Sequence, residues 1–261
     1  MAADSDEDDQ ENSPHLLPFL QDQHQDHSPP SEHQQEHYLN SITASLSIRQ
    51  LRSQGLSFQL WPAAHSLVSL LDSNPQTLLP LNPNLRILEL GSGTGLLGLA
   101  AAAILRAHVT LTDLPHVLPN LRFNADSNAG TITSRGGSVQ VHQLQWGNGL
   151  DADALGGPEA FDAVVASDVV YYEELFDPLL ETLRVFVNAE KVFVMGHLRR
   201  WKKRDAVFFR KARKVFDVLP VHTDAPLPGS RVGVVVYRFK AKKKKKKNSA
   251  TSCGTTSSEI F

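Results

Sequence analysis

A glycine-rich stretch in the first half of the chain constrains the fold more than any other feature. Residues 86–90 (RILEL) form a short apolar run typical of a buried strand, and Gly91, Gly93 and Gly95 follow at alternate positions. Residues 96–105 (LLGLAAAAIL) are then rich in good helix formers. Strand, glycine turn and helix in this order predict a nucleotide-binding βαβ unit. In such a unit the free N–H groups at the start of the helix point at the ligand.

The spacing of the glycines distinguishes between cofactors. The dinucleotide fingerprint G-x-G-x-x-G would place its third glycine at Leu96, so the pattern disfavours a nicotinamide-dependent oxidoreductase. Glu89 lies two residues before the first glycine and would present a carboxylate at the end of the strand. That carboxylate would suit the ammonium and sulfonium groups of S-adenosylmethionine, which makes Glu89 a candidate cofactor-binding residue.

A second strand is predicted at residues 108–113, and it ends in an acidic residue. Asp113 follows the glycine loop by about 20 residues, the place where a carboxylate grips ribose hydroxyls in nucleotide-binding folds. An aspartate here could equally cap the helix that we expect to start at Leu114, and both roles stay open. Together with the glycine loop, Asp113 predicts an adenosine-containing cofactor.

The rest of the pattern is typical of an alternating α/β domain with a mostly parallel sheet. Alternation over residues 42–48 and 56–60 predicts a short N-terminal hairpin, and residues 151–159 are expected to form a loop. Helices are predicted at residues 62–74, 96–105, 114–123 and 175–186, and strands of one sheet at 86–90, 108–113, 139–144, 161–171, 191–197, 214–219 and 232–239.

Polar and aromatic residues gather where these strands end. In an open parallel sheet the carboxyl ends of the strands form the ligand crevice. Trp146 follows the strand at residues 139–144, and Asp168 lies toward the end of the buried strand predicted at residues 161–171. Trp61 stands where a strand leads into a helix. Each tryptophan could line the cofactor or pack in the core, and we expect the acceptor chemistry near Asp168.

The two ends of the chain differ in composition from the middle. Residues 1–40 are rich in Asp, Glu, Gln, His and Ser, whereas residues 241–261 contain a lysine block and then a Ser/Thr-rich end. Neither segment can bury a core, so we expect both to be disordered. Residues 41–240 then form a single domain. The formal net charge is only −2, although the N-terminal segment is acidic and the C-terminal segment is basic.

The cysteine and histidine content argues against a metal site. The single cysteine, Cys253, excludes a disulfide framework and a cysteine-based zinc site, which fits a reducing, cytoplasmic location. The histidines of the first segment follow no fixed repeat, so we expect no metal there either. These are His24, His27, His33 and His37. No apolar run is long enough to span a bilayer, and we expect a monomer without membrane association.

Two basic segments raise the question of whether the protein binds nucleic acid or enters the nucleus. Residues 199–204 (RRWKKR) could grip phosphate, form a solvated helix face or border an acceptor site. We do not expect a nucleic-acid partner, because the rest of the domain has no matching basic stripe. The block at residues 242–247 could act as a nuclear-import signal, which would add the nucleus to the expected locations.

These motifs carry a resemblance to a known family. The chain resembles the class I, seven-strand S-adenosylmethionine-dependent methyltransferases, and within them the family 16 protein-lysine methyltransferases. The resemblance runs from about residue 46 to residue 239. Its markers are W-x-A-A at 61–64, LELGSGTG at 88–95, Thr-Asp at 112–113, L-x-W-G at 144–147 and SDVVY at 167–171, which contains the D-x-x-Y signature of that family.

The resemblance implies a Rossmann-like fold, S-adenosylmethionine as cofactor and the lysine side chain of a protein as acceptor. It implies cofactor contacts at Trp61, Gly91, Ser92, Gly93, Asp113, Trp146 and Ser167. It places Asp168 and Tyr171 at the junction with the acceptor. From their chemistry we expect Asp168 to orient the amine, and Tyr171 to wall the channel and hydrogen-bond the amine. The family often has alanine where Ser167 stands, and the two end segments have no counterpart in it. A non-catalytic cofactor-binding protein, or a methyltransferase for another acceptor, is the alternative.

Overall fold

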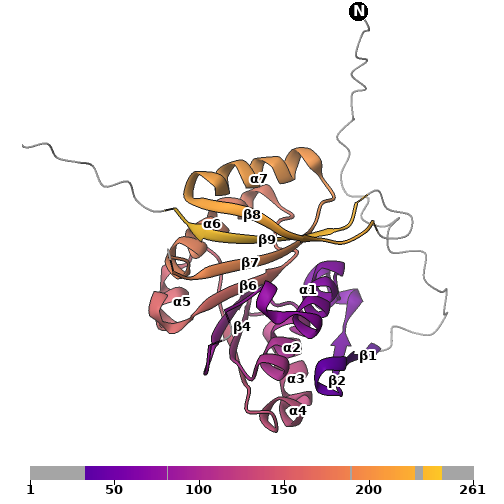
Figure 1. The fold of residues 1–261 in the computed structure, drawn as a ribbon. Helices are drawn as coiled ribbons and strands as arrows, with labels where there is room; N and C mark the ends of the chain where they lie inside the picture. The colour runs from indigo at the N-terminus through magenta and orange to yellow at the C-terminus, as the bar shows by residue number, and fades with distance from the viewer. Residues whose placement is uncertain (1–32, 81, 189, 227–231, 243–261) are drawn as a thin grey trace, which may run out of the picture. The chain divides into compact units, whose positions relative to one another are not determined.

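A twisted seven-stranded sheet forms the centre of the structure (Figure 1), a computed structural model that describes residues 33–80, 82–188, 190–226 and 232–242. The strand order is β5-β4-β3-β6-β7-β9-β8. All neighbours pair in parallel except β9, which is antiparallel to both β7 and β8. The predicted α/β fold is therefore confirmed. The strands are β3 (Arg86–Leu90), β4 (His108–Asp113), β5 (Ser138–Gln143), β6 (Ala163–Ser167), β7 (Val192–Leu198), β8 (Phe216–Thr223) and β9 (Val234–Ala241).

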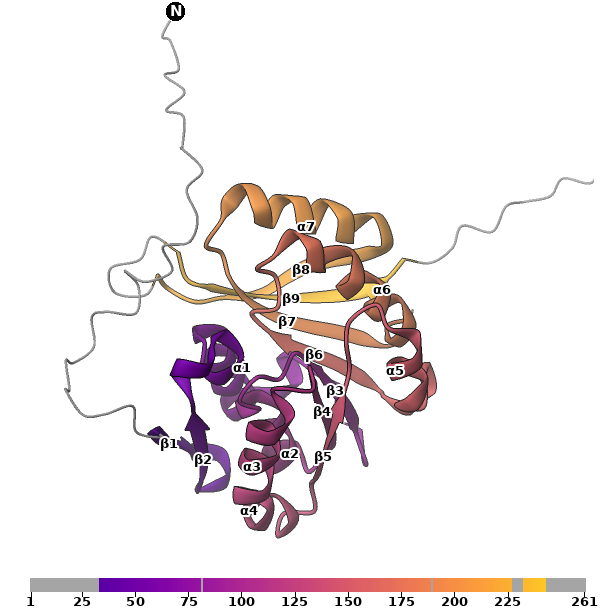
Figure 2. The same cartoon turned by 180° about the vertical axis from the view of Figure 1, so that it is seen from behind.

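Helices cover both faces of the sheet, as the two opposite views show (Figures 1 and 2). One face carries α1 (Pro62–Ser73), α2 (Leu96–Leu105), α3 (Leu118–Ser127) and α4 (Ala129–Thr133), and the other α5 (Gly149–Ala154), α6 (Phe176–Phe186) and α7 (Lys202–Val215). Single 3-10 turns occupy Asn40–Ile42, Arg52–Gln54, Leu56–Phe58, Pro75–Thr77, Pro158–Ala160 and Glu173–Leu175. Strands covered on both sides are apolar throughout, which explains why the sequence shows β7 as a nearly continuous hydrophobic run.

The two faces are packed with side chains of different size. On α2, the four alanines at residues 100–103 are fully buried, so their small side chains let the helix lie close to the sheet. The other face holds a cluster of phenylalanines from α6, α7, β7 and β9. Phe193, Phe208 and Phe239 are fully buried there, with ring centroids 5.0 to 6.5 Å apart.

The N-terminal hairpin exists and the strand predicted at residues 42–48 corresponds to β2, but the strand predicted at residues 56–60 is wrong. β1 (His33–Leu39) pairs with β2 (Ala44–Gln50), while the stretch expected to be the second strand is the 3-10 turn Leu56–Phe58. β1 also lies within the segment that we expected to be disordered. Its side chains are mostly exposed, so the strand forms through its backbone pairing with β2 and needs no apolar face of its own.

Asparagines of α3 hold the free edge of β2. Asn128 Oδ1 accepts a hydrogen bond from the Ser47 N–H (2.9 Å), and Asn124 Oδ1 accepts one from the Arg49 N–H (2.8 Å). The amide groups of the same asparagines donate to the Ser47 carbonyl (2.8 Å) and the Arg49 carbonyl (3.1 Å). The two asparagines are four residues apart and so share one helix face. The helix thereby takes the place of a further strand.

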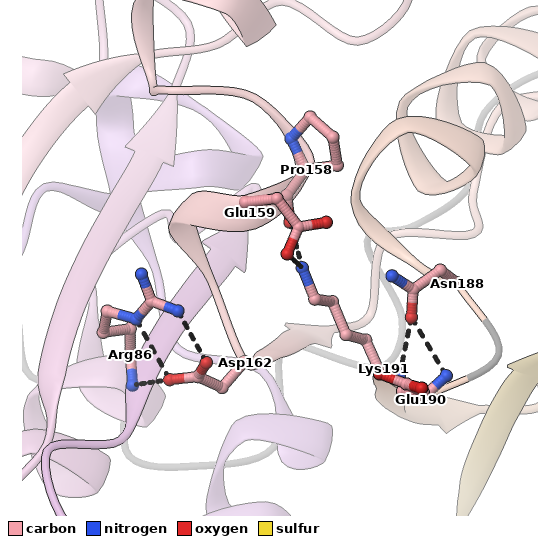
Figure 3. A network of polar contacts seen from close by, with 7 residues as sticks. All are labelled: Arg86, Pro158, Glu159, Asp162, Asn188, Glu190 and Lys191. Carbon is pink, nitrogen blue, oxygen red and sulfur yellow. Dashed lines mark hydrogen bonds and ion pairs between the residues drawn. The ribbon is translucent and has the colours of Figure 1, made fainter.

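Charged residues connect the amino ends of three sheet strands (Figure 3). Arg86 and Asp162 form a two-pronged ion pair, with 2.7 Å between Nη2 and Oδ1. Lys191, just before β7, pairs with Glu159 at 3.2 Å, and the Asn188 side chain accepts from the Lys191 N–H (3.0 Å). These contacts occupy the end of the sheet opposite to the one where the strands' carboxyl ends lie.

Two further segments differ from the predictions. The expected loop at residues 151–159 contains α5, whose first N–H groups bond to the Asn148 side chain, and the turn Pro158–Ala160. The basic residues 199–204 lead into α7. Residues 1–32 and 243–261, with most of the predicted end segments and Cys253, lie outside the described residues. Within the described ranges no helix is both long and apolar enough to cross a bilayer.

Candidate cofactor and acceptor site

The glycine loop between β3 and α2 is tied to the end of β4. The Ser92 N–H donates to the Thr112 carbonyl (2.9 Å), and the Ser92 hydroxyl accepts from the Thr112 N–H (3.0 Å). Gly91 and Gly93 have φ of +59° and +56°, values that favour glycine. A Cβ on Gly93 would lie 3.1 Å from the Ser57 carbonyl oxygen. The loop therefore needs glycine both for its conformation and for the close approach of the N-terminal region.

Asp113 binds the glycine loop directly. Its Oδ2 accepts from the Gly93 N–H (2.8 Å), and its Oδ1 accepts from the Leu114 N–H (2.8 Å). Burial raises the pKa of this carboxyl group, although both hydrogen bonds oppose the shift. The alternative role as a helix cap is not observed, because α3 begins at Leu118 and its N-cap residue is Val117. Asp113 stands beside the loop, where the ribose role remains a prediction.

Glu89 lies beneath the start of α2. Its side chain is fully buried, and Oε2 accepts from the Gly98 N–H (3.0 Å). Burial raises the pKa of Glu89 to about 8, so the carboxyl group is largely protonated at neutral pH. A protonated Glu89 would not attract a cationic ligand group through its charge, and its part in cofactor binding remains a prediction. The buried carboxyl group joins β3 to α2.

Both predicted tryptophans are half-buried near the loop. A Cβ on Gly91 would lie 3.0 Å from the Trp146 ring, so this ring lies against the bare backbone of the loop. The Trp61 ring donates through Nε1 to the Leu56 carbonyl (3.0 Å) and has the Arg200 guanidinium 5.0 Å from its centroid. Neither ring belongs to the fully buried core. Both therefore keep surface that a ligand could cover.

Asp168 follows Ser167, the last residue of β6, and its side chain is held in place from β7. Its backbone has φ +57°, an uncommon value outside glycine. Oδ1 accepts from the Leu198 N–H (3.1 Å), and Oδ2 accepts from Arg200 Nη2 (2.8 Å). Burial alone would raise the pKa of Asp168, but His197 and Arg200 outweigh it and hold the pKa below its ordinary value. Asp168 is thus a charged, fixed group and a poor base.

A buried histidine lies between Asp168 and α7. His197 is fully buried, with Nδ1 3.6 Å from Asp168 Oδ1 and Nε2 3.3 Å from Asp205 Oδ2. Neither ring nitrogen has good hydrogen-bond geometry, so these contacts are mainly ionic. Burial lowers the pKa of His197, yet the two carboxylates raise it above its ordinary value overall. His197, Asp205 and Arg200 were not predicted as site residues, although Arg200 belongs to the basic segment.

Tyr171 connects the loop after β6 with α7. Its carbonyl oxygen accepts from Arg204 Nη1 (2.9 Å), and its ring lies 4.9 Å from that of Tyr172. Burial raises the pKa of Tyr171 to about 12, and the negative charge of Asp113 adds to the shift. The phenol therefore remains protonated and is able to donate a hydrogen bond. Apart from Trp61, the acceptor and cofactor candidates all lie at or just beyond the carboxyl ends of β3, β4, β5 and β6.

Comparisons with known proteins agree with this geometry. The sequence matches the lysine methyltransferase family over residues 40–215. It is 36% identical over 189 residues to the protein N-lysine methyltransferase METTL21A of Danio rerio, which covers 72% of this chain and 79% of the relative. The protein-lysine methyltransferase METTL21E of Bos taurus is 33% identical, with 61% of this chain and 53% of that protein covered. A predicted O-methyltransferase from Agrobacterium tumefaciens shares the fold, with a TM-score of 0.51, 18% identity and coverage of 70% of this chain and 82% of that one.

Proposed function

Because this chain belongs to the lysine methyltransferase family, we propose that it transfers a methyl group from S-adenosylmethionine to a lysine side chain of a substrate protein. One observation supports this most directly: the Asp113 carboxylate binds the glycine loop, and its negative charge also raises the pKa of Tyr171. Cofactor and acceptor candidates thus share one place. Cytoplasm, and nucleus through the lysine block, remain the proposed locations.

The residues around the glycine loop suit an adenosine cofactor. Asp113 offers a carboxylate to hydroxyl groups, and Trp146 offers the face of a ring beside the bare backbone of Gly91. We assign the same role to Ser92, Gly93, Trp61 and Ser167, which line the same end of the sheet. When bound, S-adenosylmethionine supplies an electrophilic methyl group on a sulfonium centre. The protein has to exclude water and hold the acceptor in line with that group.

The acceptor amine must be neutral to react. A half-buried channel disfavours the ammonium form, so it lowers the pKa of the lysine that enters it. Asp168 is not the group that removes the proton, because its own pKa is lowered and Arg200 occupies one of its oxygens. It instead fixes the start of the loop that carries Tyr171. The protonated Tyr171 phenol can then orient the amine.

Substitutions at Asp168 and Tyr171 test this assignment. Asp168→Asn and Tyr171→Phe should reduce single-turnover methyl transfer to lysate proteins by about a hundredfold or more, because small errors in positioning are costly. Affinity for S-adenosylhomocysteine, measured by calorimetry, should change little. Tyr172→Phe is the matched control, since Tyr172 is 45% exposed beside Tyr171. Acid hydrolysis of the labelled proteins should yield methylated lysine.

Two outcomes would contradict the proposal. A stable, cofactor-binding double variant with wild-type transfer would remove both residues from the acceptor site. Tight cofactor binding by the wild type without transfer to any lysate protein would favour the alternative, a cofactor-binding protein without catalytic activity. Melting temperatures on the same preparations separate either outcome from simple unfolding.

A further inference from the structure

We infer that the site takes lysines that lie in acidic segments of its substrates, selected by a basic rim made of Arg199, Lys202 and Lys203. This inference rests on the proposed function and narrows its substrate class. The rim occupies the connection between β7 and α7 and the first turn of α7. None of these three residues has an assigned part in methyl transfer.

The rim is anchored to the acceptor site on both sides. Arg200 stands between Arg199 and Lys202 in the chain and donates to Asp168 Oδ2 (2.8 Å). Arg204 follows Lys203 and donates to the Tyr171 carbonyl (2.9 Å). Both guanidinium groups also lie over the Trp201 ring, at 6.0 Å and 4.8 Å from its centroid. These contacts fix the backbone of residues 199–204 beside the loop that carries Asp168 and Tyr171.

The charges of the rim are available to a partner. The side chains of Arg199, Lys202 and Lys203 are exposed, and none forms an ion pair with another residue in the described ranges. Farther along α7, Lys211 does form one, with Asp177 at 2.7 Å. The rim therefore contributes little to holding the fold together. Its positive charge faces solvent at the edge of the site.

The neighbouring loop has the opposite charge. Glu173 and Glu174 are exposed and directly follow Tyr172, on the connection from β6 to α6. Because β6 and β7 are adjacent in the sheet, the acidic and basic connections adjoin one another. A lysine ammonium is attracted to the glutamates, whereas acidic neighbours of that lysine are attracted to the rim. A nucleic acid would bring its phosphates against the same glutamates, which disfavours it as the occupant.

The expected preference is modest and depends on salt. Exposed charges act over about one Debye length, roughly 8 Å at physiological ionic strength, so only residues flanking the acceptor lysine are affected. Such charges mainly set specificity and association rate. We expect about a tenfold preference in affinity for acidic over basic flanks at low salt, falling toward unity in about 0.5 M salt.

The test compares three fluorescent peptides of equal length, each with a central lysine and with Glu, Gln or Lys at the flanking positions. Binding to the full chain with S-adenosylhomocysteine is followed by anisotropy, so it does not depend on turnover. The wild type should bind them in the order Glu, Gln, Lys. Lys202→Glu with Lys203→Glu should abolish or reverse this order. Glutamate in a first helical turn is favourable, so this variant should fold.

A matched control uses the same helix away from the site. Arg210→Glu with Lys214→Glu changes the charge equally at two exposed positions of α7 and should keep the wild-type order. Equal binding of the three peptides by the wild type overturns the inference, as does an unchanged order in the rim variant. The inference is also overturned if single-stranded RNA displaces the labelled Glu peptide at a lower concentration than the unlabelled Glu peptide does. If the wild type binds the peptides in the expected order but transfers no methyl group to lysate proteins, only the proposed function is refuted.

Discussion

Replacing His197 with glutamine should strongly destabilise the protein, because it removes a cation from a buried charge cluster. In the wild type, His197 lies 3.6 Å from Asp168 and 3.3 Å from Asp205, and all three side chains are at most 6% exposed. Arg200 still balances Asp168 in the variant. Within the described residues, Asp205 has no other ion-pair partner. The variant therefore leaves one buried carboxylate uncompensated.

The size of the effect follows from the burial of the pair. Breaking a buried ion pair by removing one partner costs about 3 to 5 kcal/mol. Glutamine can still donate one hydrogen bond, so we expect the lower end, about 3 kcal/mol. For a domain of this size, that corresponds to a fall in melting temperature of about 6 to 12 °C. Asp205→Asn in the same background should recover part of the loss, because it removes the uncompensated charge.

The pH dependence gives a second, independent signature. Two carboxylates raise the pKa of His197 above its ordinary value of 6.5, so the folded state binds the proton more tightly than the unfolded state. This stabilisation is complete below about pH 6.5 and is lost as the pH rises through the folded pKa. The difference in unfolding free energy between wild type and His197→Gln should thus be largest near pH 6 and shrink toward alkaline pH.

Urea unfolding of both proteins between about pH 6 and 9 measures this difference. Asp168 does not confuse the result, because its lowered pKa affects stability only in acid, as the pH falls through that lowered value. A difference below about 0.5 kcal/mol at pH 6 would show that the cluster contributes nothing. A difference that grows with pH would mean that His197 is neutral in the folded state, which would refute the ionic description.

Three other substitutions test the glycine loop and its supports. Asp113→Ala should weaken S-adenosylmethionine binding about 10- to 100-fold by calorimetry, because the Gly93 N–H loses its acceptor. Gly98→Ala should lower the unfolding free energy by about 1 to 3 kcal/mol, since its Cβ would lie 2.5 Å from the buried Glu89 carboxyl; Gly149→Ala has open space and should not. Asn124→Ala should speed amide hydrogen exchange throughout β1 and β2, because it releases the Arg49 backbone from α3.

The parts that sequence predicted well are those governed by local spacing. The glycine loop and Asp113 lie on consecutive strand–loop–helix units, and the structure joins them through the Gly93 N–H. Strand β1 could not be found in this way, because its polar side chains carry no alternation and only its backbone takes part. The helix α5 was missed although a signal existed: Asn148, a favourable N-cap residue, directly precedes it.

The buried charge cluster could not be predicted from the sequence, for a different reason. Asp168, His197 and Asp205 come from three separate segments, and only the adjacency of β6 and β7 brings them together. In the sequence His197 and Asp205 look like ordinary polar residues, and nothing there links them to Asp168. The full burial of Glu89 could not be predicted either, because it follows from the packing of α2 over β3 and not from its neighbours in the chain.

The position of β9 between β7 and β8 affects how the chain folds during its synthesis. Residues 192–198 are all buried, yet one side of β7 has no backbone partner until residues 234–241 have been synthesised. Strands β3, β4, β5 and β6, in contrast, can pair with one another as soon as residue 167 has been synthesised. A nascent chain therefore carries an unpaired apolar strand edge for a time, the kind of surface that promotes aggregation and recruits chaperones.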